Sequence, residues 1–261
     1  MKLWGLELTK IRKLKAEEAL GASLPIMYLV YVLFWGYDSI QQFVGLGLIV
    51  LVWEVVLWHR LTKGKKEFAK KLTTILPLLT IFVASVGMGA AYSLAKEKQA
   101  LDADPTHIAS CSINPIVSCA ASVTTEQGSA LGVSNPSLGI VAYGLLLLLG
   151  IGLLIGLKMS KQWWWLVFAG GIFGIGFCVY LFTQSLYVIG TLCLYCSTIW
   201  AVTSAFFVYA TTHIFLQDYI PSSKKIKSWL EKNHMLPLLI IYVLIILLIY
   251  FRWSEYWNSI A

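Results

Sequence analysis

The chain has 261 residues, of which 58% are hydrophobic and only 13% are charged. Ordinary soluble domains are roughly 45–50% apolar and about 25% charged. With a mean hydropathy of +0.75, the composition excludes a soluble globular protein. A net charge of +7 would suit nucleic acid, but the basic residues cluster between apolar segments, so we expect no nucleic-acid partner. The sequence predicts an all-α polytopic membrane helix bundle.

Seven apolar segments are long enough to cross a hydrocarbon core, which needs about 20 residues of helix. A basic, helix-compatible segment, 1–18, precedes them and lacks a signal-peptide cleavage site, so we interpret it as a cytoplasmic amphipathic start. The predicted spans are 19–37, 40–58, 72–95, 138–157, 163–188, 192–216 and 235–253.

The spans divide the chain into three parts. Residues 1–71 are expected to form the N-terminal segment, a two-span hairpin and a basic linker. Residues 72–216 form a four-helix core, and residues 217–261 form a cytoplasmic loop and a final transmembrane helix.

The basic residues favour one orientation for the spans. Of the 20 Lys and Arg residues, 17 lie on the side of the amino terminus: 11 before residue 72, two between the fourth and fifth spans, and four between the last two spans. Lys96, Lys98 and Arg252 fall on the opposite side. The positive-inside rule therefore predicts a cytoplasmic amino terminus.

Four of the five cysteines form two spaced pairs, Cys111 with Cys119 and Cys193 with Cys196. The predicted orientation places both pairs on the non-cytoplasmic side, the first in the polar loop 96–136 and the second at the outer end of the sixth span. Two dithiols in an oxidising compartment can exchange electrons through a mixed disulfide. A redox relay is therefore favoured over a simple loop disulfide. We expect no metal, because the second pair lies in an apolar helix mouth and not on knuckle turns.

The second pair is a Cys-x-x-Cys that opens an apolar run. Thr191 follows Gly190 at the expected N-cap, which puts Cys193 in the first turn, where free N–H groups favour a thiolate. Cys196 then lies about 4.5 Å deeper, at 1.5 Å per residue. Cys193 is expected to face the loop and Cys196 the space among the helices. A quinone is the natural oxidant for a dithiol that faces into a bilayer.

The cysteine pairs and their neighbours resemble the vitamin K epoxide reductase family, in particular its bacterial members that oxidise a periplasmic thioredoxin-fold protein. The resemblance covers residues 72–216, and the seventh span is similar to the fifth helix of the bacterial members. The matching residues are Cys111-Ser-Ile-Asn-Pro-Ile-Val-Ser-Cys119, Gly132-Val-Ser-Asn135-Pro-Ser-Leu-Gly139, Tyr143, and Cys193-Leu-Tyr-Cys196 with Trp200.

The resemblance implies a disulfide-forming oxidoreductase of a bacterial plasma membrane that uses a quinone, such as ubiquinone, menaquinone or a relative. Cys196 would engage the quinone and Cys193 would take the disulfide from the loop. Cys111 and Cys119 would shuttle electrons from the partner, with Cys111 as the one that meets Cys193. The family often carries a fused thioredoxin-like domain, whereas only residues 252–261 follow the last span here, so we expect a separate thioredoxin-fold partner.

Three further residues are assigned by the same resemblance. Asn135 would donate a hydrogen bond to a quinone carbonyl, and Tyr143 would lie near the same pocket. Thr125 stands where the family usually has a serine, six residues after the second loop cysteine, and keeps a hydroxyl. The alternative functions are reduction of a quinone or its epoxide as the physiological direction, and a non-enzymatic seven-span protein with a structural loop disulfide.

Overall fold

In the computed structural model, residues 2–3, 6–7, 15–35 and 67–260 are described, together with positions 48, 51, 52, 55, 56, 59 and 63. Most of the predicted second span, 40–58, lies outside the described residues. Within them, five helices are long and apolar enough to cross a membrane, and two further helices form a bent pair of the same character. The predicted all-α membrane bundle is therefore confirmed.

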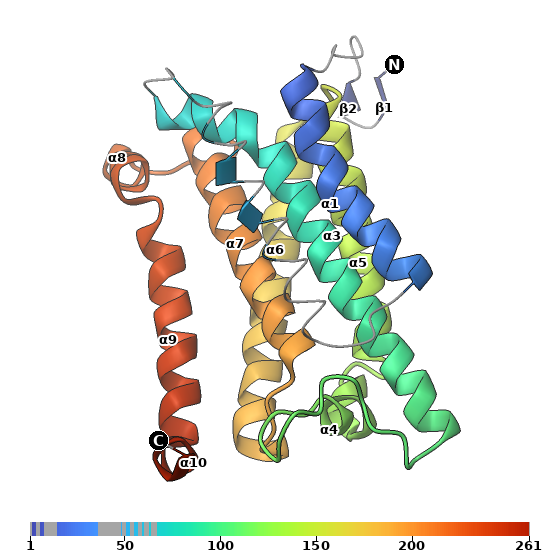
Figure 1. Cartoon of the computed structure of the whole chain (residues 1–261). Coiled ribbons are helices and arrows are strands. Elements are labelled where there is room, and N and C mark those ends of the chain that lie inside the picture. Colours follow the sequence, from blue (N-terminus) through green and yellow to red (C-terminus); the bar gives the residue numbers. More distant parts are fainter. Residues whose placement is uncertain are drawn as a thin grey trace.

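The long helices of the bundle run roughly along one common direction, whereas the short helix α8 (Lys224–Asn233) lies across it (Figure 1). The helices are α1 (Ala16–Trp35), α3 (Phe68–Ala103), α4 (Ala120–Thr124), the 3-10 helix η1 (Glu126–Ser129), α5 (Asn135–Leu154), α6 (Lys161–Gln184), the π-helix η2 (Ser185–Ile189), α7 (Leu194–Leu216), α8 (Lys224–Asn233), α9 (Leu236–Arg252) and α10 (Ser254–Ile260).

Three two-residue strands lie at the end of the bundle where α1 begins (Figure 1). Strand β2 (Leu6–Glu7) pairs with β1 (Lys2–Leu3) on one side and with β3 (Lys158–Met159), between α5 and α6, on the other, as an antiparallel sheet. Residues 2–3 and 6–7 are thus extended, where the sequence predicts a helix, because the backbone hydrogen bonds of β2 go to another segment.

Helix α3 is the centre of the bundle, and it packs against α1, α5 and α7. Of its most apolar stretch, 83% of the residues are buried, against half or less in every other candidate span. The helices approach closely where a glycine faces a neighbour: a Cβ on Gly150 of α5 would lie 3.0 Å from the backbone nitrogen of Ile81. Small residues permit such close packing between membrane helices.

Two predicted segments differ most from the structure. Helix α3 continues to Ala103, eight residues past the predicted end, because Lys96, Glu97 and Lys98 are polar but form helix readily. The predicted loop 217–234 contains the ten-residue helix α8, which begins at a Ser223 N-cap. The first difference extends the central helix toward the cysteine loop.

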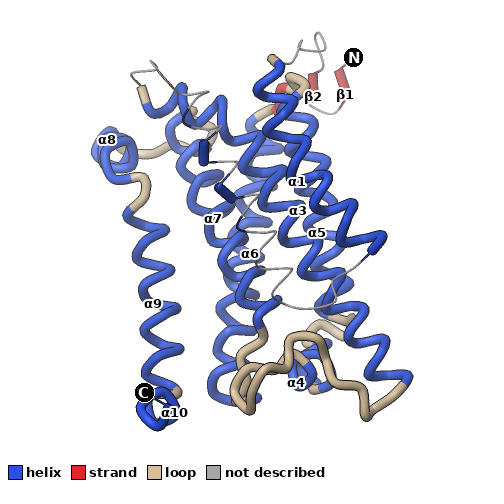
Figure 2. The backbone as a smooth tube through the Cα atoms, viewed as in Figure 1, coloured by secondary structure: helices blue, strands red, loops and turns tan. Residues whose placement is uncertain are grey.

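The two ends of the bundle differ in chemistry. The loop between α3 and α5, the start of α7 and the end of α9 lie together at one end (Figure 1), and Figure 2 shows this loop as largely irregular backbone around α4. Arg252 at the end of α9 donates from Nε to the carbonyl oxygen of Leu186 in η2, at 2.8 Å. Lys158, Lys161 and the lysines of α8 lie at the opposite end.

Candidate redox site

The loop between α3 and α4 is closed by a disulfide between Cys111 and Cys119, whose Cα atoms are 5.8 Å apart. Asn114 turns the chain between them: its Oδ1 accepts from the backbone N–H of Ile116 at 3.0 Å and of Val117 at 2.8 Å. Such local bonds from asparagine stabilise a turn. Neither cysteine has exposed surface, so the disulfide is fully buried.

A backbone bridge joins this loop to the segment before α7. Val117 and Leu192 form a parallel β-bridge. Leu192 donates its N–H to the carbonyl oxygen of Ile116 at 2.7 Å, and its own oxygen accepts from Ser118 N–H at 3.1 Å. Since Ser118 precedes Cys119 and Leu192 precedes Cys193, the bridge places one cysteine of each pair next to it.

The four paired cysteines lie in or against one apolar cluster. Cys111, Cys119 and Cys193 are among its fully buried members, and Cys196 packs against it while remaining partly exposed. Cys193 and Cys196 are not bonded to each other. The structure therefore brings together the two pairs that the sequence places 74 residues apart, from Cys119 to Cys193.

Cys193 is itself the N-cap of α7, and its Sγ accepts the backbone N–H of Cys196 at 3.2 Å. The prediction that Thr191 is the N-cap and that Cys193 lies in the first turn is wrong. Leu192 is held extended by the bridge to the loop, so the helix begins only after it. The sulfur of Cys193 nevertheless faces the N–H groups at the start of the helix, as its bond from Cys196 shows.

Cys196 lies at the junction of two apolar clusters. It packs against the cluster of the other cysteines and against a second one that contains Cys178, Phe182 and Trp200. The rings of Phe182 and Trp200 meet edge to face with centroids 5.0 Å apart. The deeper cysteine of the motif thus lies next to aromatic side chains of α6 and α7.

A polar network beside the loop disulfide was missed by sequence reasoning. Glu97, on the added turns of α3, accepts the N–H of Ser110 at 3.0 Å and lies 3.0 Å from Nε2 of His107. The hydroxyl of Ser110 lies 3.2 Å from that of Tyr195, which is buried between the two cysteines of the motif. Hydropathy gives no signal for this network, because its members come from three separate segments.

Asn135 and Thr125 both support the backbone of the loop. The Nδ2 of Asn135 donates to the carbonyl oxygen of Gln127 at 2.6 Å, and its Oδ1 accepts from the N–H of Ala130 at 3.2 Å. The hydroxyl of Thr125 donates to the carbonyl oxygen of Ala121 at 2.8 Å, at the end of α4. The amide of Asn135 has one further N–H, which these two bonds do not use.

Tyr143 lies deeper in the bundle, where its hydroxyl is 2.6 Å from Oγ1 of Thr203 on α7. Asn135 is eight residues before Tyr143, and Cys196 is seven residues before Thr203. Helix α5, which carries Asn135 and Tyr143, and helix α7, which carries Cys196 and Thr203, run in the same direction in Figure 1. At 1.5 Å per residue, Asn135 and Cys196 therefore both lie about 10–12 Å from this contact, at the same level of the bundle.

Comparison with known proteins identifies the family of the chain. No curated protein matches the chain. The model of the vitamin K epoxide reductase family matches residues 78–211, slightly more than half of the chain. The match contains the loop disulfide, Asn135, Tyr143 and the Cys193-x-x-Cys196 motif. Together with the apolar spans, it identifies a membrane redox protein, and the chain belongs to the vitamin K epoxide reductase family.

Proposed function

We propose that the protein oxidises a separate thioredoxin-fold dithiol protein and passes the two electrons to a membrane quinone through its two cysteine pairs. The observation that carries the proposal is the bridge between Val117 and Leu192, which holds the loop disulfide against the start of the Cys193-x-x-Cys196 motif. A disulfide that only stapled the loop would need no such attachment.

The proposed transfer consists of two thiol–disulfide exchanges, the first with the partner and the second between the two cysteine pairs of the chain. The partner's dithiol reduces the Cys111–Cys119 disulfide and is itself oxidised to a disulfide. The resulting loop dithiol, with Cys111 as the attacking thiol, then reduces a Cys193–Cys196 disulfide, which restores the loop disulfide and leaves two thiols in the motif. Each exchange proceeds through a mixed disulfide and moves two electrons and two protons. The structure has the loop disulfide formed and the motif cysteines free, which corresponds to the state after both exchanges.

The surroundings of Cys196 suit an apolar, flat acceptor. The buried rings of Phe182 and Trp200 pack next to it, and the remaining N–H of Asn135 is a donor at the same level of the bundle. A bound quinone supplies a two-electron, two-proton acceptor for the motif dithiol. Cys196, which is partly exposed, is better placed to meet a molecule from the bilayer than Cys193, which is fully buried.

The orientation and the compartment are part of the proposal. The positive-inside rule puts the end of the bundle that bears α8 in the cytoplasm of a bacterial cell and the cysteine end on the periplasmic side. Disulfides persist in that oxidising compartment. Because the direction of transfer follows the potentials of partner and quinone, reduction of a quinone or its epoxide is the second candidate.

The decisive experiment follows quinone absorbance after mixing the purified protein with oxidised quinone and a reduced thioredoxin-fold protein. We expect Cys196→Ala to abolish quinone reduction. Cys178→Ala is the matched control, because Cys178 is a buried free cysteine of the same bundle, and it should keep wild-type turnover. Unchanged turnover in Cys196→Ala would refute the proposal. Oxidation of added quinol in place of quinone reduction would favour the reverse direction.

A further inference from the structure

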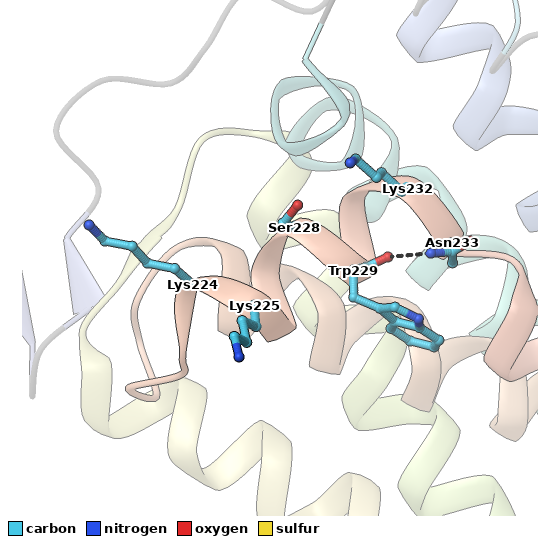
Figure 3. A pocket seen from close by; sticks show the side chains of 6 residues that line it. All are labelled: Lys224, Lys225, Ser228, Trp229, Lys232 and Asn233. Atoms are coloured by element: carbon cyan, nitrogen blue, oxygen red, sulfur yellow. Dashed lines mark hydrogen bonds between the residues drawn. The ribbon is translucent and has the colours of Figure 1, made fainter.

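Helix α8 carries a basic face that the proposed redox chemistry does not use. We infer that this face binds the acidic headgroups of phospholipids and holds α8 along the membrane surface. The face consists of Lys224, Lys225, Ser228, Trp229 and Lys232, all of which are exposed. With Asn233 they line a shallow pocket of about 450 Å³ at the surface (Figure 3).

The opposite face of α8 is anchored to the bundle. Lys227 forms a salt bridge with Asp218, and Leu230 is buried. At the end of the helix, the ring of His234 stacks on that of Phe68 at the start of α3, with centroids 3.9 Å apart and planes within 12°. These contacts fix which side of α8 faces away from the protein.

The outward face has unbalanced positive charge. Among the residues that the structure describes, no carboxylate lies within salt-bridge distance of Lys224, Lys225 or Lys232. By contrast, Lys227 on the inner face is paired. Figure 3 shows Lys224 at the start of the helix reaching away from it, and Lys232 near its end. A row of unpaired lysines is complementary to a surface of phosphate groups.

The position of α8 relative to α9 suits a lipid surface better than a soluble partner. The axes of the two helices differ by 65° across a short break. Within the described chain no side chain of α9 is fully buried, so α9 meets lipid over much of its surface and enters the bilayer beside α8. A helix at such an angle to a spanning helix lies across the membrane normal, at headgroup depth. Trp229, 45% exposed, provides the amphipathic ring typical of that depth.

The inference can be tested by tryptophan quenching in lipid nanodiscs. The full-length protein is placed in discs of phosphatidylcholine that contain either brominated phosphatidylglycerol or an equal fraction of brominated phosphatidylcholine. The signal of Trp229 is the difference between the protein and its Trp229→Phe variant. We expect the acidic lipid to quench this signal several-fold more than the zwitterionic lipid.

The charge dependence separates headgroup binding from simple proximity to lipid. In Lys224→Gln/Lys225→Gln/Lys232→Gln the several-fold preference for the acidic lipid should be lost, so that both lipids quench about equally, because each lysine near an acidic surface strengthens association about fivefold. Lys158→Gln/Lys161→Gln, at the same end of the bundle, is the matched control and should retain the preference. Equal quenching by both lipids in the unsubstituted protein, or an unchanged preference in the triple variant, would overturn the inference.

Discussion

The hydroxyl oxygens of Ser110 and Tyr195 lie 3.2 Å apart, although 85 residues separate them in the chain. Ser110 immediately precedes Cys111, and Tyr195 lies between Cys193 and Cys196. This hydrogen bond therefore connects the loop disulfide to the helical motif at a second point, in addition to the backbone bridge at Leu192. The backbone bridge and this hydrogen bond thus both hold the loop disulfide close to the Cys193-x-x-Cys196 motif.

Loss of this hydrogen bond should slow transfer between the pairs without removing any sulfur. A typical hydrogen bond contributes about 1 kcal/mol net, so Ser110→Ala should slow the exchange by about fivefold. Stopped-flow measurement of quinone reduction, started with reduced partner, gives the rate. Ser112→Ala is the control, because its hydroxyl bonds to Ser118 within the loop. A slower rate in Ser112→Ala than in Ser110→Ala would contradict the assignment.

The carboxylate of Glu97 should hold the loop more strongly than any single hydroxyl. It accepts from the N–H of Ser110 and contacts His107, and bonds to charged groups are worth about 1.5–3 kcal/mol. Glu97→Ala should therefore increase hydrogen exchange of the amides of residues 107–111 by tenfold or more. Asp102→Asn removes a more exposed carboxylate, paired with Lys98 on the same helix, and should leave these amides unchanged.

The contact between Gly87 and Tyr143 should tolerate no added methyl group. A Cβ on Gly87 would lie 2.4 Å from the tyrosine ring, whereas a Cβ on Gly144 of α5 would meet nothing within 4 Å. Overpacking costs about 1–3 kcal/mol. We expect Gly87→Ala to lower the melting temperature and Gly144→Ala to leave it unchanged or raise it. Equal melting temperatures for the two variants would show that α3 and α5 do not approach as described.

Hydropathy and helix-end chemistry predict much of this fold. The fourth predicted span, 138–157, corresponds to α5 within three residues at each end. Its actual limits follow local signals: Pro136 suits the first turn, and Gly156, at a φ of +98°, adopts the left-handed backbone that ends a helix. Both cysteine pairs are also apparent from spacing alone. These features depend on residues close together in the chain.

The contacts that assemble the site depend on residues far apart, and no local pattern encodes them. The bridge of Val117 to Leu192 uses backbone atoms, so side-chain identity carries no signal for it. It also explains the wrong N-cap prediction, since tertiary pairing of Leu192 overrides the preference of Thr191 for a helix start. Hydropathy predicts a loop at Glu97, because charged residues end an apolar segment. The helix continues past it, since charged residues do not by themselves end a helix.

The stack of His234 on Phe68 should make the attachment of α8 dependent on pH. Burial, and then the charge of Lys71, lower the pKa of His234 below its ordinary 6.5. The unfolded or detached state then binds more protons, so the attachment is fully stable above pH 6.5 and weakens as the pH falls toward the folded pKa. Hydrogen exchange of α8 between pH 7.5 and about 5 should show this weakening. His234→Phe keeps the stacked ring and should remove the pH dependence that the unsubstituted protein shows.

The backbone bridge offers the sharpest test of how the two cysteine pairs are coupled. Leu192→Pro removes the N–H that donates to the carbonyl oxygen of Ile116, while Leu192→Ala keeps that N–H and shortens only the side chain. If the bridge holds the loop disulfide against Cys193, Leu192→Pro should slow electron transfer from the partner to quinone about a hundredfold or more. Leu192→Ala should slow it far less. Trapping the mixed disulfide between loop and motif by mass spectrometry, in a background that lacks Cys196, measures the coupling directly. Equal yields of this species in the proline and alanine variants would mean that the pairs meet by another route.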